Sequence, residues 1–354
     1  MPAAERHFNF DVYGAQPDNG KSELPVWLDY IEMVCLLNKD NTMTRGQVYD
    51  LVFNEAPEIT PQTDDELPPE DGQPLSVQVA SDTNNQTVLS WFSALKSKSE
   101  EFGEAYPFIV NSSVGEIKLK NDLSDENKFY IYLLMSASLK VFSNKLRNKI
   151  TTDFEFVCFE AQERIFPLSK LGVNAETHFF GKNPEAKTGR FVGKLEDKFQ
   201  ALAQLINCHN LDISPLKSNN TGDRGIDVLS VFRFERDRAF GLPLIIAQCA
   251  CSYEDWTTKQ YDHHKEKYYH YRLFPYDYIR ITFIPFYYRD VVGQWFKPDD
   301  ISTVVIDRLR LIRIMEESSY QVSKRALDLA ELALMRNDAD KQEFARSIIS
   351  NRAA

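Results

Sequence analysis

Two short apolar runs, residues 226–234 and 244–250, constrain the fold of this 354-residue chain more than any other feature. The first run follows a Gly-Asp-Arg-Gly turn, and a charged connection that contains Gly241 and Pro243 separates it from the second. Both runs are rich in β-branched or aromatic residues and are bounded by turn residues, a pattern typical of buried strands. The stretch therefore predicts two adjacent strands inside a core.

Two polar residues interrupt these apolar strands. Asp227 lies one residue into the first strand, and Gln248 lies near the end of the second. A buried carboxylate and a buried amide need partners, and a metal ion is one good partner for both. An Asp at the start of a strand also caps turns. The presence of Gln248 in the next strand favours the metal interpretation over the cap.

Composition limits the classes of protein that remain. A hydrophobic content of 43% with 12% aromatic residues excludes global disorder, and the length predicts two domains or one large domain with appendages. No apolar run approaches the length of a membrane span, and the N-terminal residues lack the apolar core of a signal peptide. Five cysteines, an odd number, predict reduced thiols and a cytoplasmic protein. The net charge of -11 excludes a generally basic surface but not a local basic groove.

The first 120 residues predict an accessory, mainly helical region. Residues 22–54 predict two short helices joined by a turn, which suits a helical docking domain or a winged-helix-like unit. Residues 55–74 carry seven acids and five prolines, so they predict a solvated linker. A helix over residues 86–102 and a hairpin over residues 106–120 complete the region.

Residues 121–300 predict a second, mixed unit. Residues 128–146 are densely apolar and predict one buried helix, and Thr151-Thr152-Asp153 predicts the cap of another helix that ends before Pro167. The remaining predicted elements follow in chain order: a strand at 178–182, a helix at 189–207, the two strands above, a helical stretch at 253–271, a strand at 276–288, and two or three helices in a tail from residue 301.

The order of elements and three short motifs carry a resemblance. The motifs are Gly-Asp-Arg-Gly-Ile-Asp at 222–227, Ile-Ala-Gln at 246–248 and Phe-Glu at 154–155. Residues 151–288 resemble the core of PD-(D/E)xK restriction-endonuclease-like proteins, in particular the Mrr-like branch. The resemblance does not extend to residues 1–120.

The resemblance implies a fold and a function. The fold would be α/β (α+β), a restriction-endonuclease-like core of mixed sheet at 121–300, with helical extensions at 1–120 and 301–354. The function would be cleavage of DNA phosphodiester bonds with Mg²⁺ or Mn²⁺ in a bacterial antiviral or restriction system. The acidic charge and spare helical regions predict protein partners in a defence complex, and restriction-type nucleases often pair their subunits. No membrane partner is expected.

The resemblance also assigns roles to residues. Asp227 would be the central metal ligand, Gln248 would offer its amide oxygen where an acid is more usual, and Glu155 would ligate the ion or orient water. The lysine of the family motif belongs at position 250, which is Ala250 here. Three alternatives follow: Lys259 or Arg224 substitutes for it, the site cuts slowly or conditionally, or the domain is an inactive nuclease fold that binds DNA or acts as a scaffold.

A zinc site is a further candidate. Its ligands would come from Cys249 and Cys251, from Cys208 with His209, and from His263 with His264. These spacings match none of the usual zinc-ligand pairs, and buried cysteines commonly act as small hydrophobic residues. The spacing therefore favours a structural role for these cysteines.

Overall fold

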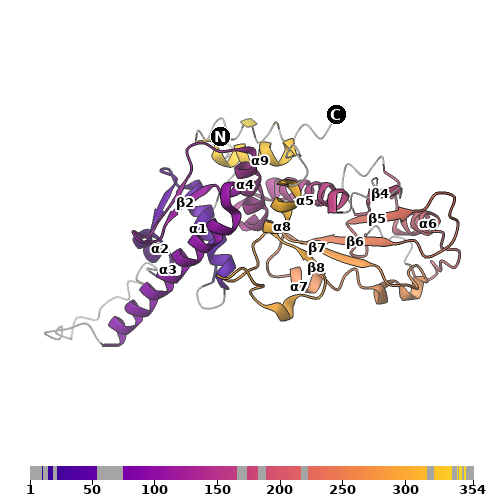
Figure 1. Cartoon of the computed structure of the whole chain (residues 1–354), viewed down its shortest axis with the longest axis horizontal. Helices are drawn as coiled ribbons and strands as arrows, with labels where there is room; N and C mark the ends of the chain where they lie inside the picture. Colours follow the sequence, from indigo (N-terminus) through magenta and orange to yellow (C-terminus); the bar gives the residue numbers. More distant parts are fainter. Residues whose placement is uncertain are drawn as a thin grey trace, which may run out of the picture.

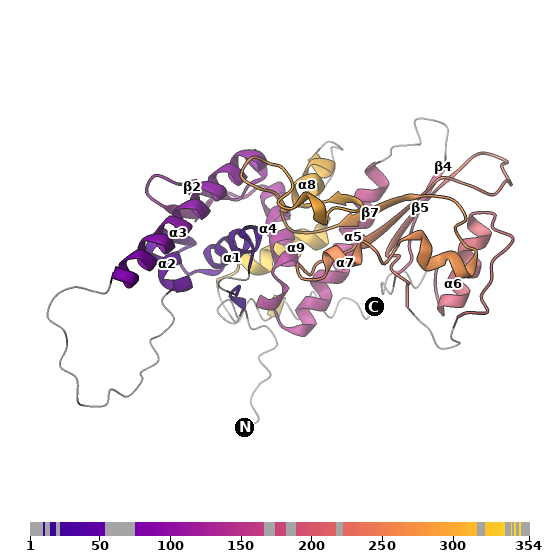
Figure 2. The same cartoon turned by 90° about the horizontal axis from the view of Figure 1, so that it is seen from below.

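The protein is a mixed α/β molecule built around two sheets (Figure 1). The computed structural model describes residues 10, 15–18, 22–53, 75–165, 174–181, 189–216, 222–316 and 323–336, with residues 341, 343, 344 and 347. A small sheet with its helices lies at one end of the long axis and the larger sheet at the other, with a group of helices between them (Figures 1 and 2). The predicted fold class, α/β with flanking helices, is confirmed.

The larger sheet contains both predicted strands of the 226–250 stretch. Its strand order is β4-β5-β6-β7-β8. β4 pairs antiparallel with β5 and β5 antiparallel with β6, whereas β6–β7 and β7–β8 are parallel pairs. The strands are β4 (Asn174–Phe179), β5 (Val228–Arg233), β6 (Leu244–Cys249), β7 (Ile279–Phe283) and β8 (Val304–Ile306). The predicted strand at 276–288 is confirmed as β7.

Helices cover both faces of this sheet. The helix α5 (Asn144–Ile165) lies on one face, where Val228 and Ala247 belong to the same buried cluster as its Phe154. The helix α6 (Leu195–Leu205) lies on the other face, where Leu229 belongs to the second cluster. Since β5 and β6 are buried on both faces, they carry continuous apolar runs rather than alternating ones.

The N-terminal part holds the smaller sheet. Its order is β1-β3-β2, and all pairs are antiparallel. The elements are α1 (Leu24–Leu37), β1 (Thr42–Thr44), α2 (Arg45–Phe53), α3 (Leu75–Phe102), β2 (Phe108–Asn111) and β3 (Glu116–Leu119). The predicted hairpin and the two short helices are confirmed, and β1 is an addition. The predicted linker at 55–74 lies outside the described residues.

The predicted helix boundary at Thr151 is wrong. The chain forms α4 (Asp125–Ala137), a 3₁₀ turn η3 (Leu139–Val141) and then α5, so residues 128–146 are not one helix. Thr151 and Thr152 lie inside α5, and their hydroxyls donate to carbonyls one turn back, at 3.0 and 2.7 Å. Because a threonine hydroxyl can bond within its own helix, the Thr-Thr-Asp sequence does not have to mark a cap.

The segments after β6 and after residue 300 also differ from prediction. The stretch 253–271 forms one turn of helix, α7 (Trp256–Lys259), and a 3₁₀ helix, η6 (Lys265–Tyr271), instead of a longer helix. The tail begins with strand β8 and continues as α8 (Arg308–Glu316) and α9 (Lys324–Leu334). Among the described residues, no helix combines the length and apolar character that crossing a bilayer requires.

A buried ionic network joins the N-terminal helices to α8. The guanidinium of Arg308 donates to both carboxylate oxygens of Asp29, at 3.0 and 2.7 Å. Lys98 of α3 contacts Asp29 at 2.8 Å and Glu32 at 2.9 Å, and the Tyr130 hydroxyl of α4 donates to Glu32 at 2.8 Å. All five side chains are buried. The network fixes α1, α3, α4 and α8 to one another.

Candidate functional site

The candidate site lies where β5 begins and β6 ends. Asp227 precedes Val228 of β5, whose register partner in β6 is Ala247. The Asp227 amide donates to the Ala247 carbonyl at 2.9 Å, and its own carbonyl accepts from the Phe180 amide at 2.8 Å. Asp227 is therefore held by backbone hydrogen bonds between the end of β4 and the end of β6.

The structure brings Asp227 and Gln248 into contact. The Gln248 amide nitrogen donates to Asp227 Oδ2 at 2.8 Å, and the Cys249 backbone amide donates to the same oxygen at 2.7 Å. The two residues are 7% and 8% exposed. Gln248 Oε1 is buried and has no hydrogen-bond partner among the described residues. A buried acceptor without a donor is costly, and a cation would satisfy it.

Charged groups from three other segments act on Asp227. Burial raises the pKa of Asp227 well above its usual range, and repulsion from Glu155 and Asp223 raises it further. The Cys249 amide and the ammonium of Lys259 oppose this rise in the Asp227 pKa. The charges of Glu155 on α5, of Asp223 in the turn and of Lys259 on α7 therefore all act on Asp227.

The Gly-Asp-Arg-Gly turn positions Asp227 through close packing. Gly225 has φ +81°, and a Cβ atom there would lie 2.5 Å from the side chain of Asp262 and 2.6 Å from its backbone. The Gly225 amide donates to Asp223 Oδ1 at 2.9 Å, and the Tyr268 hydroxyl donates to the Arg224 carbonyl at 2.7 Å. Only glycine fits this contact, which holds the turn against the segment that follows α7.

Position 250, where the resembling family has its motif lysine, is an alanine in apolar surroundings. Ala250 is fully buried in an apolar cluster with Trp256 and Phe286. Of the two substitutes considered, Lys259 at the end of α7 is half-buried and acts electrostatically on Asp227. The Arg224 guanidinium donates instead to the Tyr271 hydroxyl at 2.9 Å and lies over the Tyr271 ring. Lys259 is thus the better placed of the two.

The charges of Asp227 and Glu155 act on three thiols, those of Cys158, Cys249 and Cys251. Burial raises the pKa of the Cys158 thiol of α5 and of the Cys249 thiol of β6. Burial raises the pKa of the Cys251 thiol as well, and the charges of Glu155 and Asp227 raise it further. Cys158 was not among the predicted site residues. The three-residue spacing between Glu155 and Cys158, which puts both residues on one face of a helix, could have indicated it.

The donor set suits a hard divalent cation better than zinc. Among the described residues, no group of three His, Cys, Asp or Glu side chains is placed to hold a metal ion. Cys208, one ligand of the less favoured zinc alternative, donates its thiol to the Arg272 carbonyl. Magnesium needs only one or two carboxylates with an amide or carbonyl oxygen, because it keeps several waters. Asp227 and the Gln248 oxygen, which has no hydrogen-bond partner in the described part of the chain, are oxygen donors of this kind.

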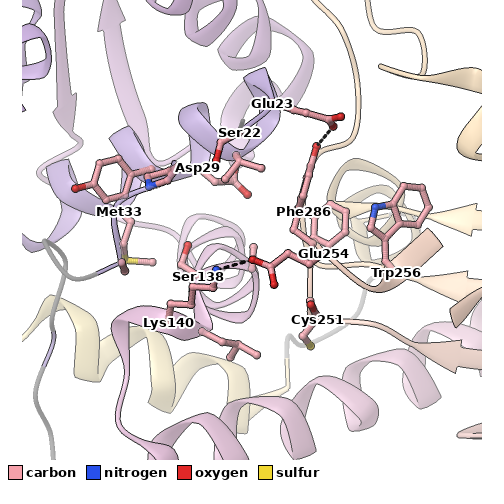
Figure 3. A pocket seen from close by; sticks show the side chains of 18 of the residues that line it. Ser22, Glu23, Asp29, Met33, Ser138, Lys140, Cys251, Glu254, Trp256 and Phe286 are labelled. Atoms are coloured by element: carbon pink, nitrogen blue, oxygen red, sulfur yellow. Dashed lines mark hydrogen bonds and ion pairs between the residues drawn. The ribbon is translucent and has the colours of Figure 1, made fainter. Parts of the chain in front are cut away.

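A cavity of about 600 Å³ lies beside the site, between α1 and the segments that leave β6 and β7 (Figure 3). Cys251 lines this cavity, and the charges of Asp227 and Lys259 act on its thiol. Among its lining residues, Lys140 and Glu254 form an ion pair at 2.6 Å, and the Tyr253 hydroxyl donates to Glu23 at 2.9 Å. The cavity and the carboxyl cluster therefore share the segment that follows β6.

Comparisons with protein-family models, with curated proteins and with solved structures found no match for this chain.

Proposed function

We propose that this chain is a metal-dependent nuclease that hydrolyses DNA phosphodiester bonds, as a component of a bacterial antiviral or restriction system. The observation that carries the proposal is the hydrogen-bonded pair of Asp227 and Gln248 at the ends of adjacent strands, and the charges of Glu155 and Lys259 act on this pair at Asp227. The order α5, β4, α6, β5, β6, α7, β7 also supports the PD-(D/E)xK resemblance.

Each residue would have a defined task. Asp227, Glu155 and the Gln248 oxygen would hold Mg²⁺ or Mn²⁺, and such an ion polarises a phosphate and lowers the pKa of an attacking water. The hydrogen bonds from the Gln248 and Cys249 nitrogens keep the Asp227 carboxylate in one orientation. The ammonium of Lys259 would stabilise negative charge that develops on the phosphate oxygens, as the motif lysine does in the resembling family.

A second candidate function is supported by the surroundings of position 250. Ala250 occupies the place of the motif lysine and lies in an apolar cluster. This observation favours an inactive nuclease fold that serves a defence complex as a DNA-binding or scaffolding subunit.

Cleavage of supercoiled plasmid in Mg²⁺ or Mn²⁺ separates the two candidates. The nuclease should convert plasmid to nicked or linear DNA, and Asp227→Asn should abolish that conversion. Asp277→Asn is a matched control, because Asp277 is an exposed aspartate whose side chain is 84% accessible. Absence of cleavage with either metal, alone and with copurifying partners, would support the scaffold.

A further inference from the structure

The cavity beside the site has the size and lining of a small-molecule site. Its volume of about 600 Å³ falls within the range of pockets that bury small organic ligands. The residues that line it come from α1 and the segment before it, from the connection between α4 and α5, and from the segments after β6 and β7. Figure 3 shows side chains from these separate segments converging on one space.

One wall of the cavity is aromatic and rigid. The Tyr253 ring packs against Phe286 at 4.8 Å between centroids and against Tyr288 at 5.9 Å. Trp256 lies behind Phe286 and Tyr288, with ring centroids 5.9 and 4.7 Å away. The hydrogen bond from the Tyr253 hydroxyl to Glu23 fixes the ring further. Such a surface suits stacking of a flat heterocycle.

The charged groups of the lining select against a polyanion. Acidic side chains line the cavity from several segments, including Glu23, Glu254 and Asp300, whereas Lys140 is its only lysine or arginine among the described residues. Lys140 pairs with Glu254, and both side chains are about 70% exposed, so this pair lies at the mouth. Carboxylate oxygens accept hydrogen bonds from amino groups such as those of cytosine.

We propose that this cavity binds a nucleobase that bears an exocyclic amino group, stacked on Tyr253 and hydrogen-bonded to Glu254. The base comes either from an unpaired nucleotide of a nucleic-acid strand or from a free nucleoside. The first source rests on the proposed nuclease function. Cys251 lines the cavity, and the charges of Asp227 and Glu155 act on its thiol, so a strand at the proposed nuclease site would lie near the cavity. The binding chemistry itself does not depend on cleavage.

Calorimetric titration of the full chain with nucleosides tests the inference. Cytidine, adenosine and guanosine should bind saturably and more tightly than uridine, which lacks the amino group. Cytidine triphosphate should bind more weakly than cytidine, because the acidic lining repels its phosphates. Absence of saturable binding by every nucleoside, or uridine binding as tightly as cytidine, would overturn the proposal.

Two variants with matched controls locate the binding site. Tyr253→Leu should weaken cytidine binding about tenfold or more, as expected for a lost stacking contact. Glu254→Gln should weaken it several-fold without affecting folding, since Glu254 is largely exposed. Tyr269→Leu and Glu266→Gln, at exposed positions of η6, should bind cytidine as the parent chain does. Unchanged affinity in both cavity variants would contradict the assignment.

A final arm identifies the source of the base and keeps the two proposals separate. If a cytosine-containing single-stranded oligonucleotide loses affinity in Tyr253→Leu in parallel with cytidine, the base belongs to a strand. If only cytidine loses affinity, the ligand is a free nucleoside. If the chain binds cytidine but cuts no DNA, the cavity is a nucleobase site and the nuclease function is wrong. If the chain cuts DNA but binds no nucleoside, the nuclease function stands and the nucleobase site is wrong.

Discussion

Under the proposed nuclease function, catalysis would depend on Lys259. The motif lysine expected at position 250 is absent, and Ala250 is buried among apolar side chains. Lys259 belongs to α7, the element that follows β6, and its charge acts on Asp227. A lysine from another element would then supply the positive charge although the motif spacing is lost.

Lys259→Met should therefore lower the rate of metal-dependent plasmid cleavage about 100- to 1000-fold, the range expected when one preorganised charge at a reacting centre is removed. Binding of Mn²⁺ should persist, because Lys259 is not a ligand. Lys265→Met is the matched control, since Lys265 forms an exposed ion pair with Asp277 at 2.6 Å. Unchanged cleavage in Lys259→Met would exclude Lys259 as the substitute.

The sequence predicted part of this site at the level of single residues. The positions of Asp227 and Gln248 in adjacent apolar runs predicted a polar pair, and the structure brings these two side chains into hydrogen-bond contact. The contribution of Asp223 and the proximity of Cys158 were not predicted. Both depend on how the turn and α5 pack against the sheet, and no local sequence pattern encodes that packing.

At the scale of elements, the turn at 222–227 and the segment after α7 act as one unit. Gly225 allows the turn to touch Asp262, and Lys259 precedes Asp262 by less than one helical turn. The contact therefore joins the turn that precedes Asp227 to the segment that follows Lys259. Since glycine at φ +81° adopts this conformation without a steric penalty, the motif glycine is required by geometry.

Gly225→Ala should destabilise the chain by about 2 kcal/mol or more, through the strained φ and the clash with Asp262. It should also reduce cleavage beyond what the remaining folded fraction explains. Gly46→Ala is a clean control, because a Cβ at Gly46 has no atom within 4 Å. Urea denaturation provides the comparison, and equal stability of the two variants would contradict the packing described.

Prediction of elements succeeded where the pattern is local and failed where tertiary contacts decide. The strands β5, β6 and β7 followed from apolar runs bounded by turn residues, and the hairpin β2–β3 followed from its short connection. The break between α4 and α5 was misplaced, because Thr151 and Thr152 bond within their helix. The stretch 253–271 forms only short helices, and the turn at Gly225 packs against it at Asp262.

At the scale of the whole molecule, the N-terminal region and the tail share one core with the larger sheet. Buried side chains from α1, α4, α5, β5, α8 and α9 belong to a single cluster, and β8 extends the sheet. The ionic network around Arg308 lies at this junction. Removal of one partner from a buried ion pair of this kind strongly destabilises a protein, because the remaining charge is left unpaired.

Arg308→Met should lower the free energy of unfolding by about 3–5 kcal/mol. Arg313→Met, at an exposed position on the same helix, should lower it by less than about 1 kcal/mol.

The network should also make the stability of the chain depend on pH. Burial alone would raise the pKa of Asp29, but Arg308 and Lys98 outweigh the effect of burial and hold that pKa below its usual value. This stabilisation is present above the unfolded pKa of about 4 and is lost as pH falls through the folded pKa.

The most direct measurement is calorimetric titration of the chain with Mn²⁺ at neutral pH. Binding should be saturable, because Asp227, Glu155 and Gln248 would supply the carboxylate and amide oxygens that such an ion takes. Asp227→Asn should abolish the binding, while Asp277→Asn should retain it. Equal Mn²⁺ binding by the parent chain and Asp227→Asn, or no binding by either, would contradict a metal site at Asp227.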